Sequence, residues 1–173
     1  IVKNPALPDR DLFVYSTITD ARLQVVDTVG TLLYGIAVDS VGKVYVTQTD
    51  ARNVENGRAG TLKEGLAEME NRAFLNQITK INCEGTCGTP EFIELEPLPP
   101  DHPAPGMALA TPFGIEVSAD DATLVVTAAG SNKLFTVDAA SGAVLGRVDV
   151  DAAPRGVALQ SDADGAPLQA WVY

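Results

Sequence analysis

The sequence predicts an all-β fold, a β-propeller fragment of about three four-stranded antiparallel blades with one short helical insertion. Three observations support this. A glycine followed by a short apolar strand, a turn and a second strand occurs three times, at Gly35, Gly114 and Gly156. The last two of these glycines are 42 residues apart, which matches the period of about 40 to 45 residues of a four-stranded blade. The longest apolar runs are of strand length.

The most regular copy of the unit occupies residues 112–154. β-branched and aromatic residues dominate its strand-length segments, and Ser141-Gly142 supplies the turn between the last two segments. This pattern predicts one complete blade. Its expected strands are 113–118, 123–127, 133–138 and 143–150.

The preceding copy, residues 34–111, is longer because two insertions, 54–76 and 97–110, interrupt it. The first contains the capping-box sequence Thr61 to Glu64 followed by apolar residues at helical spacing as far as Ala73, which predicts a short amphipathic helix. The second carries five prolines, which predict an extended surface segment without ladder hydrogen bonds. The expected strands of this copy are 34–39, 43–47, 77–82 and 91–96.

The two ends of the chain predict incomplete blades within a single incomplete propeller domain, residues 1–173. Residues 1–33 form a partial blade, in which 11–15 and 22–27 resemble the second and third strands of the regular copy and the outer strand is short or missing. Residues 155–173 start the next blade. About three blades cannot close a ring that usually has four to eight. We therefore expect the remaining blades in a longer chain, or self-association through the open blade edges.

Charge and hydropathy exclude two classes of partner. The chain has 12 Lys and Arg against 23 Asp and Glu, a formal net charge of -11. Phosphate backbones are repelled by such a surface, so we expect no nucleic-acid partner. No apolar run approaches the roughly 20 residues of a membrane-spanning helix, so we expect no membrane span.

The repeat segments resemble the YVTN family of β-propeller repeats. The resemblance is carried by Lys43-Val44-Tyr45-Val46-Thr47 in one unit and by Asn132-Lys133-Leu134-Phe135-Thr136-Val137-Asp138 in another. It covers about two thirds of the chain and omits the insertions. The resemblance implies a propeller blade of an extracytoplasmic protein, one that binds partners or flanks a catalytic domain, including haem-containing ones. It implies no catalytic residues.

Cys83 and Cys87 are the sharpest chemical feature of the sequence. They flank three residues in the expected turn between the third and fourth strands of the longer copy. A disulfide that pins this turn is the first interpretation, and it would place the protein in an oxidising compartment, periplasmic or secreted. A reduced pair and a metal site are the alternatives, although a metal would require further ligands.

Other chemistry-bearing residues favour structural roles. Asp162-x-Asp164-Gly165 lacks the downstream Glu of an EF-hand loop, so turn chemistry is preferred over a calcium site. Four polar residues lie near strand ends, where propellers build sites around the central channel, but solvation of hairpin ends or pairing between blades is the preferred explanation: Asp39, Asp50, Arg52 and Glu116. Four aromatic residues at strand positions are expected to pack between blades: Tyr15, Tyr45, Phe135 and Trp171.

The combined interpretation is a non-catalytic scaffold that contacts another protein or domain through its blade loops. No catalytic constellation and no required cofactor are evident, and calcium remains an open possibility. The alternatives are part of a lactonase-like hydrolase with a metal in the central channel, or a propeller that accompanies a redox (haem) domain. The insertions supply the candidate partner-binding residues, although the apolar ones among them could instead pack on their own blade. These residues are Arg58, Leu62, Leu66, Met69 and His102.

Overall fold

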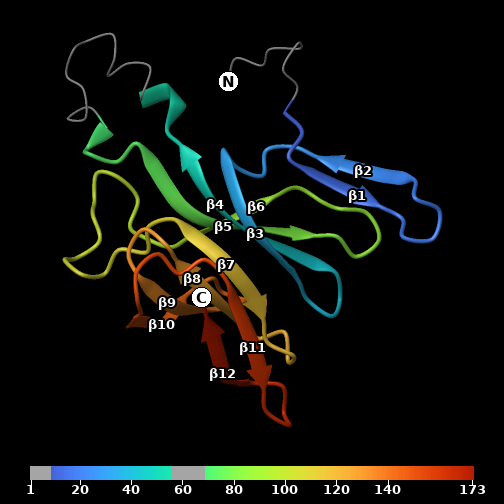
Figure 1. Cartoon of the computed structure of the whole chain (residues 1–173). Helices are drawn as coiled ribbons and strands as arrows, with labels where there is room; N and C mark the ends of the chain where they lie inside the picture. Colours follow the sequence, from blue (N-terminus) through green and yellow to red (C-terminus); the bar gives the residue numbers. More distant parts are fainter. Residues whose placement is uncertain (1–8, 56–68) are drawn as a thin grey trace.

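The computed structural model describes residues 9–55 and 69–173, and it confirms the all-β prediction (Figure 1). Nearly all of its regular structure is strand. The strands are β1 (Leu12–Tyr15), β2 (Arg22–Val26), β3 (Leu32–Val38), β4 (Lys43–Ala51), β5 (Phe74–Asn82), β6 (Glu91–Glu94), β7 (Pro112–Val117), β8 (Thr123–Ala128), β9 (Lys133–Asp138), β10 (Val144–Asp149), β11 (Val157–Ser161) and β12 (Pro167–Val172).

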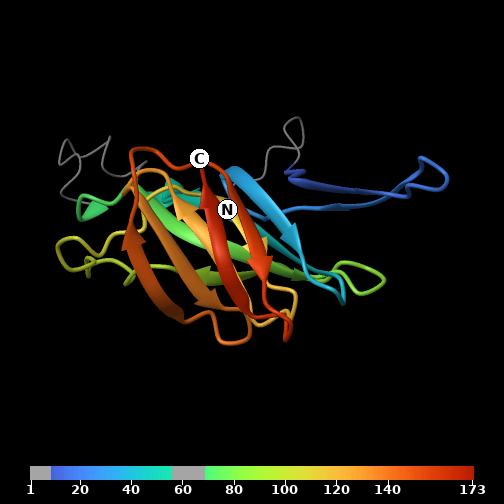
Figure 2. The ribbon, with the colours of Figure 1, turned by 60° about the horizontal axis from the view of Figure 1, so that its bottom comes forward.

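The strands form four antiparallel sheets in chain order. The two central sheets each contain four strands, β3-β4-β5-β6 and β7-β8-β9-β10, and the terminal sheets are the hairpins β1-β2 and β11-β12. Neighbouring units lie side by side, with β7 against β3 and β4, and β11 against β7 and β8 (Figure 2). This propeller-like succession of four-stranded sheets agrees with the predicted fold class.

Two apolar cores lie between neighbouring sheets. The larger lies between the central sheets and includes the fully buried Ile78, Leu124 and Phe135. The smaller lies on the opposite face of the first central sheet, where Val44 and Ile81 are covered by the β1-β2 hairpin and the segment that follows it. Successive residues of a strand point to opposite faces of its sheet, and the central strands have buried residues on both faces. Each central sheet therefore packs against two neighbouring sheets.

The glycines that lead the repeats allow the inner strands of successive sheets to approach closely. A Cβ on Gly35 would lie 2.2 Å from the carbonyl oxygen of Phe113, and one on Gly114 would lie 2.6 Å from that of Arg155. The Gly35 N–H donates to Thr47 Oγ1 at 2.8 Å. The same bond recurs one unit later, from the Gly114 N–H to Thr127 Oγ1 at 2.8 Å. The spacing found in the sequence therefore reflects one packing contact repeated from unit to unit.

A repeated asparagine fixes the connection between successive sheets. The side-chain oxygen of Asn76 accepts from the Thr111 N–H at 3.0 Å, and that of Asn132 accepts from the Ala153 N–H at 3.0 Å. Thr111 and Ala153 both have positive φ, 54° and 55°. Each therefore makes the same turn into an inner strand, and the asparagine pins that turn.

The short turns at the other end of the sheets are tied across successive units. The Ser40 N–H donates to Asp121 Oδ1 at 2.9 Å, and the Ala119 N–H donates to Ser161 Oγ at 3.2 Å. Hydrogen bonds from Ser40 lower the pKa of the Asp121 carboxyl. These polar ties and the apolar cores together hold the units in line.

The assignment of the first hairpin requires a correction. The sequence suggested that β1 and β2 were the second and third strands of a blade with a missing outer strand. In the structure β2 leads directly into β3 through residues 27–31, as β10 leads into β11 through residues 150–156. The hairpin also lies against the outer turn of the first central sheet, where Gln24 exchanges two hydrogen bonds with the backbone of Cys87. Strand direction and position thus make β1 and β2 the third and fourth strands.

The prediction that four aromatic side chains pack between sheets is confirmed for the two on the central sheets and wrong for the two on the terminal hairpins. Tyr45 and Phe135, each 1% exposed, pack between the central sheets as expected. Tyr15 and Trp171 are 57% and 54% exposed, so the expectation of inter-blade packing is wrong for them within the described chain. Both lie on terminal hairpins, which have a neighbouring sheet on one side only.

The two insertions emerge at one end of the first central sheet. Because successive strands run in opposite directions, the β4-β5 and β6-β7 connections share an end (Figure 1). Residues 53–55 are helical, whereas Glu70 and Asn71 have positive φ, so the predicted helix does not reach Ala73. Its predicted start at Thr61 lies outside the described residues. The proline-rich segment contains no strand, as expected.

Candidate functional site

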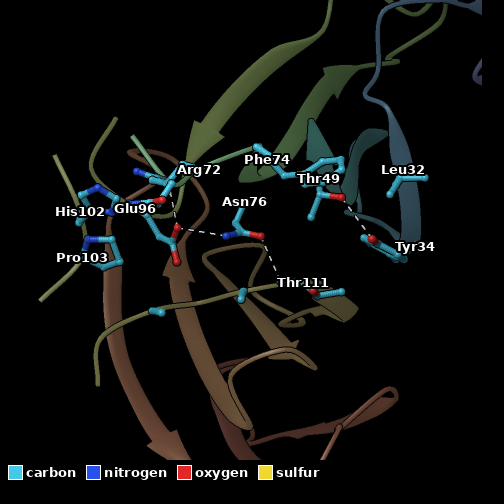
Figure 3. Close-up of a pocket in the computed structure, with 14 residues that line it drawn as sticks. Leu32, Tyr34, Thr49, Arg72, Phe74, Asn76, Glu96, His102, Pro103 and Thr111 are labelled. Atoms are coloured by element: carbon cyan, nitrogen blue, oxygen red, sulfur yellow. Dashed lines mark hydrogen bonds and ion pairs between the residues drawn. The ribbon is translucent and has the colours of Figure 1, made fainter. Parts of the chain in front are cut away.

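A cavity of about 490 Å³ opens at the end of the first central sheet where both insertions emerge (Figure 3). Strands β3, β4 and β5 supply one wall, and the β6-β7 connection supplies the other. Its lining is largely apolar with a polar floor. The lining residues are Leu32, Tyr34, Thr49, Asn71, Arg72, Ala73, Phe74, Asn76, Glu96, His102, Pro103, Ala108, Ala110 and Thr111.

A buried ion pair lies at the polar side of this cavity. Arg72 Nη2 lies 3.0 Å from Glu96 Oε2, and the two side chains are only 9% and 5% exposed. Arg72 Nη1 also donates to the backbone oxygens of Pro97 and Asp101, the latter at 3.1 Å. The buried Arg72 guanidinium thus pairs with the Glu96 carboxylate and donates hydrogen bonds to the backbone of the proline-rich segment. A buried charge requires such partners.

Glu96 and Asn76 complete the floor. Glu96 Oε2 accepts from Asn76 Nδ2 at 3.0 Å, and Glu96 Oε1 accepts from the Leu109 N–H at 2.8 Å. Together with the bond from Thr111 to Asn76, these contacts hold the start and the end of the β6-β7 connection. The polar groups of the floor are thus engaged in holding the loop.

Arg52 supports the same end from the β4-β5 connection. Its Nη1 donates to the backbone oxygens of Met69 and Arg72, at 2.7 and 3.0 Å, and to Glu70 Oε2 at 2.9 Å. The segment that carries Arg72 is therefore fixed to the end of β4, which holds Arg72 at the floor of the cavity.

A series of stacked side chains runs along the inner strands beside the cavity. The rings of Tyr34 and Phe113 stack with centroids 5.0 Å apart, and the Arg155 guanidinium lies 5.1 Å from the centroid of Phe113. Each of these residues immediately precedes a repeat glycine. The Tyr34 hydroxyl is also within 3.2 Å of Thr49 Oγ1.

The candidate partner-binding residues fall in different places. His102 is exposed and lines the cavity, so its role in binding a partner stays a prediction. Met69 is buried, 5% exposed, and packs within the chain. Arg58, Leu62 and Leu66 lie outside the described residues.

The cysteine prediction is confirmed, because Cys83 and Cys87 form a disulfide. It closes the β5-β6 turn, and the Cys87 backbone meets Gln24 of the first hairpin. A disulfide fits an extracytoplasmic location. In the described residues no helix is long and apolar enough to cross a membrane.

The acidic residues at strand ends serve the turns. Asp162 Oδ1 accepts from the Asp164 and Ala166 N–H groups, at 2.9 and 3.0 Å, and Asp39 Oδ1 accepts from the Lys43 N–H at 2.7 Å. Within 9–55 and 69–173, no group of three or more His, Cys, Asp or Glu side chains is arranged to hold a metal ion. Asp50 accepts from the Thr31 hydroxyl at 2.8 Å.

Two side chains that do not line the cavity have raised pKa values. Burial, with the nearby carboxylates of Asp39 and Asp121, raises the pKa of Tyr45 to about 12. Desolvation also raises the pKa of Glu94, although Gln77 Nε2 donates to its carboxylate at 2.6 Å. Neither group faces the cavity, so these shifts concern stability.

The comparisons with known proteins bear on the fold. No family model and no curated protein matches the sequence. Among solved structures, the chain is similar to hydrazine synthase of Kuenenia stuttgartiensis, with a TM-score of 0.61 and 15% identity over 87% of this chain. The match covers 45% of that chain, so this chain spans less than half of its length. At this identity, the likeness shows a shared fold.

Sequence reasoning missed the residues that build the cavity floor. Arg72 and Glu96 are 24 residues apart and belong to different connections. The signal available was topological, since two insertions at the same end of one sheet must meet. The resulting site is a largely apolar concavity that the His102 imidazole helps to line.

Proposed function

We propose that this chain is a non-catalytic part of a propeller, of the YVTN type, that binds another protein or domain through the end of the first central sheet. One observation carries the proposal. The polar groups of the cavity floor, Arg72, Glu96 and Asn76, are engaged by one another and by loop backbone. They build a fixed concave surface, and recognition is the use to which such a surface is suited.

The partner is expected to insert an apolar side chain beside His102. Leu32 and Phe74, 47% and 46% exposed, stand at the cavity and offer apolar area. Fully covering such side chains contributes about 1.5–3 kcal/mol each. The disulfide supports an extracytoplasmic setting for this encounter.

Site-specific crosslinking tests the proposal. A photoreactive amino acid is placed at position 74, and a control at position 98, where Leu98 is 51% exposed but does not line the cavity. In the producing cell, a discrete crosslinked protein is expected from position 74 only. Phe74→Asp should then weaken binding of that purified protein at least about tenfold, or 1.4 kcal/mol. Equal crosslinking from both positions, or unchanged affinity, would refute the proposal.

A second candidate is that the chain is the propeller part of a larger enzyme, such as a lactonase-like hydrolase with a channel metal, or accompanies a redox domain. It is favoured by the solved structure of the same fold, which is named a synthase and is more than twice as long as the match. For the metal enzyme, calcium should raise the melting temperature with concentration, because a ligand of the native state stabilises it. An unchanged melting temperature would count against the metal enzyme.

A further inference from the structure

Arg147, on the outer strand β10, is poorly supplied with hydrogen-bond acceptors. Its Nε atom is buried and has no hydrogen-bond partner among the described residues. Its Nη1 atom donates to the sulfur of Met107, at 3.4 Å. A guanidinium carries five N–H donors, whereas a thioether sulfur is a weak acceptor. Because buried polar groups are normally satisfied, this contact calls for an explanation.

The strand register explains why Arg147 points toward the β6-β7 connection. Arg147 pairs with Phe135 across β10 and β9, and residues that lie directly opposite each other have side chains on the same face of a sheet. Phe135 belongs to the core between the two central sheets. Arg147 therefore points toward the first central sheet and meets the β6-β7 connection, which lies beside β10 (Figure 1).

The carboxylates close to this contact are engaged by other cations. Asp149 lies two residues further along β10, on the same face, and pairs with Lys133. Glu96, at the start of the β6-β7 connection, belongs to the ion pair at the cavity floor. Among the described residues, Met107 is therefore the group that the Arg147 side chain meets as a hydrogen-bond acceptor.

Oxidation of Met107 would supply a strong acceptor at this point. When a thioether meets a peroxide, the sulfur attacks one peroxide oxygen, an S–O bond forms and the O–O bond breaks. The sulfur loses two electrons, and the other peroxide oxygen takes up the proton and leaves as water. The product is a sulfoxide, whose oxygen is polar and lies one bond from the sulfur. Since a methionine side chain has three rotatable bonds, that oxygen can turn toward the Arg147 guanidinium.

The two methionines of the chain differ in their access to an oxidant. Met107 is 44% exposed, whereas Met69 is 5% exposed. The two cysteines are joined in the disulfide, so no thiol competes for the oxidant. Exposure governs the oxidation of methionine, and a peroxide is therefore expected to react first at Met107.

We propose that Met107 is a site of oxidation by peroxides, and that Arg147 binds the resulting sulfoxide and so fastens the β6-β7 connection to β10. Ala108, the next residue, lines the cavity. Oxidation would therefore hold this wall of the cavity against the second central sheet. The contact between Met107 and Arg147 does not depend on the partner-binding function, and it can be tested without a partner.

Mass spectrometry after treatment with hydrogen peroxide tests the site of oxidation. The whole folded chain is treated together with free methionine, which reports that the oxidant is active. Peptides that contain Met107 are expected to gain one oxygen atom before those that contain Met69, the buried control in the same molecule. Met107 left unmodified while free methionine is oxidised, or Met69 oxidised first, would overturn the proposal.

Thermal unfolding tests whether Arg147 binds the sulfoxide. The oxidised wild type is expected to melt about 2–4 °C above the reduced wild type, because a weak hydrogen bond is replaced by a charge-assisted one. Arg147→Leu keeps apolar bulk and removes the donors, so oxidation should give no such rise in this variant. An equal rise in the wild type and in Arg147→Leu, or no rise in the wild type, would contradict the role of Arg147.

Hydrogen exchange gives a second measurement that requires no substitution of Arg147. The Met107 N–H donates to the Ala104 backbone oxygen at 2.9 Å. If the sulfoxide fastens this segment, that amide should exchange about tenfold more slowly after oxidation, since local opening becomes rarer. Met107→Leu, treated in the same way, is the control and should not change. Unchanged or faster exchange in the oxidised wild type would refute the proposal.

Discussion

Replacement of Gly35 by alanine tests the contact that sets the spacing of the sheets. The new methyl group would lie 2.2 Å from the Phe113 carbonyl oxygen, more than 1 Å inside ordinary van der Waals contact. That oxygen is backbone of β7, so the sheets must separate. Overpacking of this kind costs about 1–3 kcal/mol, and the reduced entropy of the unfolded chain returns about 0.4–1 kcal/mol. We therefore expect a net loss of about 1–2 kcal/mol.

Urea unfolding followed by far-ultraviolet circular dichroism measures this loss, and a thermal scan should show a melting temperature about 2–8 °C lower. Gly146→Ala is the matched control. Its Cβ would meet Thr136 Oγ1 at 3.7 Å, an ordinary contact, so it should be neutral or stabilise by up to about 1 kcal/mol. If Gly35→Ala unfolds at the wild-type urea concentration while the control behaves as expected, the close approach of the inner strands is refuted.

Three further perturbations have defined outcomes. Arg72→Met strands the buried Glu96 carboxylate and should cost about 3–5 kcal/mol in urea unfolding, whereas adding Glu96→Gln should recover part of it; no loss would contradict the ion pair. Replacing Cys83 and Cys87 by serine opens a short loop and should cost about 2 kcal/mol, and an unchanged unfolding midpoint would argue against the bridge. The raised pKa of Glu94 means that the folded state favours the protonated carboxyl. Protonated Glu94 therefore adds to the free energy of unfolding below its ordinary pKa of 4.5, and this added stability is lost as the pH rises through the folded-state pKa. Glu94→Gln should accordingly stabilise the chain above that range and not below it, and equal stability at both pH values would refute the shift.

Strand positions were largely predictable from the sequence. The segment from Lys133 to Asp138 was predicted with its exact bounds, because a turn asparagine precedes it and alternating apolar residues fill it. The extension of β4 to Ala51 was not predicted, since the polar run Gln48, Thr49 and Asp50 reads as the end of a strand. Gln48 and Thr49 are nonetheless buried. Gln48 lies against Gly30 in the segment that joins the first hairpin to β3, whereas Thr49 lies on the other face, beside Tyr34.

The site was less predictable than the fold, because its parts come from different connections. His102 could be nominated as a lone histidine in an insertion, but its neighbours Arg72 and Glu96 read as ordinary surface charges. Only the pairing of the two insertions at one end buries them. Similarly, the place of β1 in its blade depends on the route from Val26 to Leu32, which local sequence similarity does not reveal.

Hydrogen bonds between Ser40 and Asp121 and between Ala119 and Ser161 join the short turns of successive sheets. We call this end of the sheets the clamped rim, and the opposite end, where the two insertions emerge, the variable rim. The pitch from one sheet to the next is set at the clamped rim and along the inner strands. Length can therefore be added or removed between Arg52 and Arg72, or between Glu96 and Thr111, without changing the curvature of the assembly. A binding surface built from these two connections would therefore be supported by a rigid set of sheets, and its own residues would not be needed to hold those sheets in place.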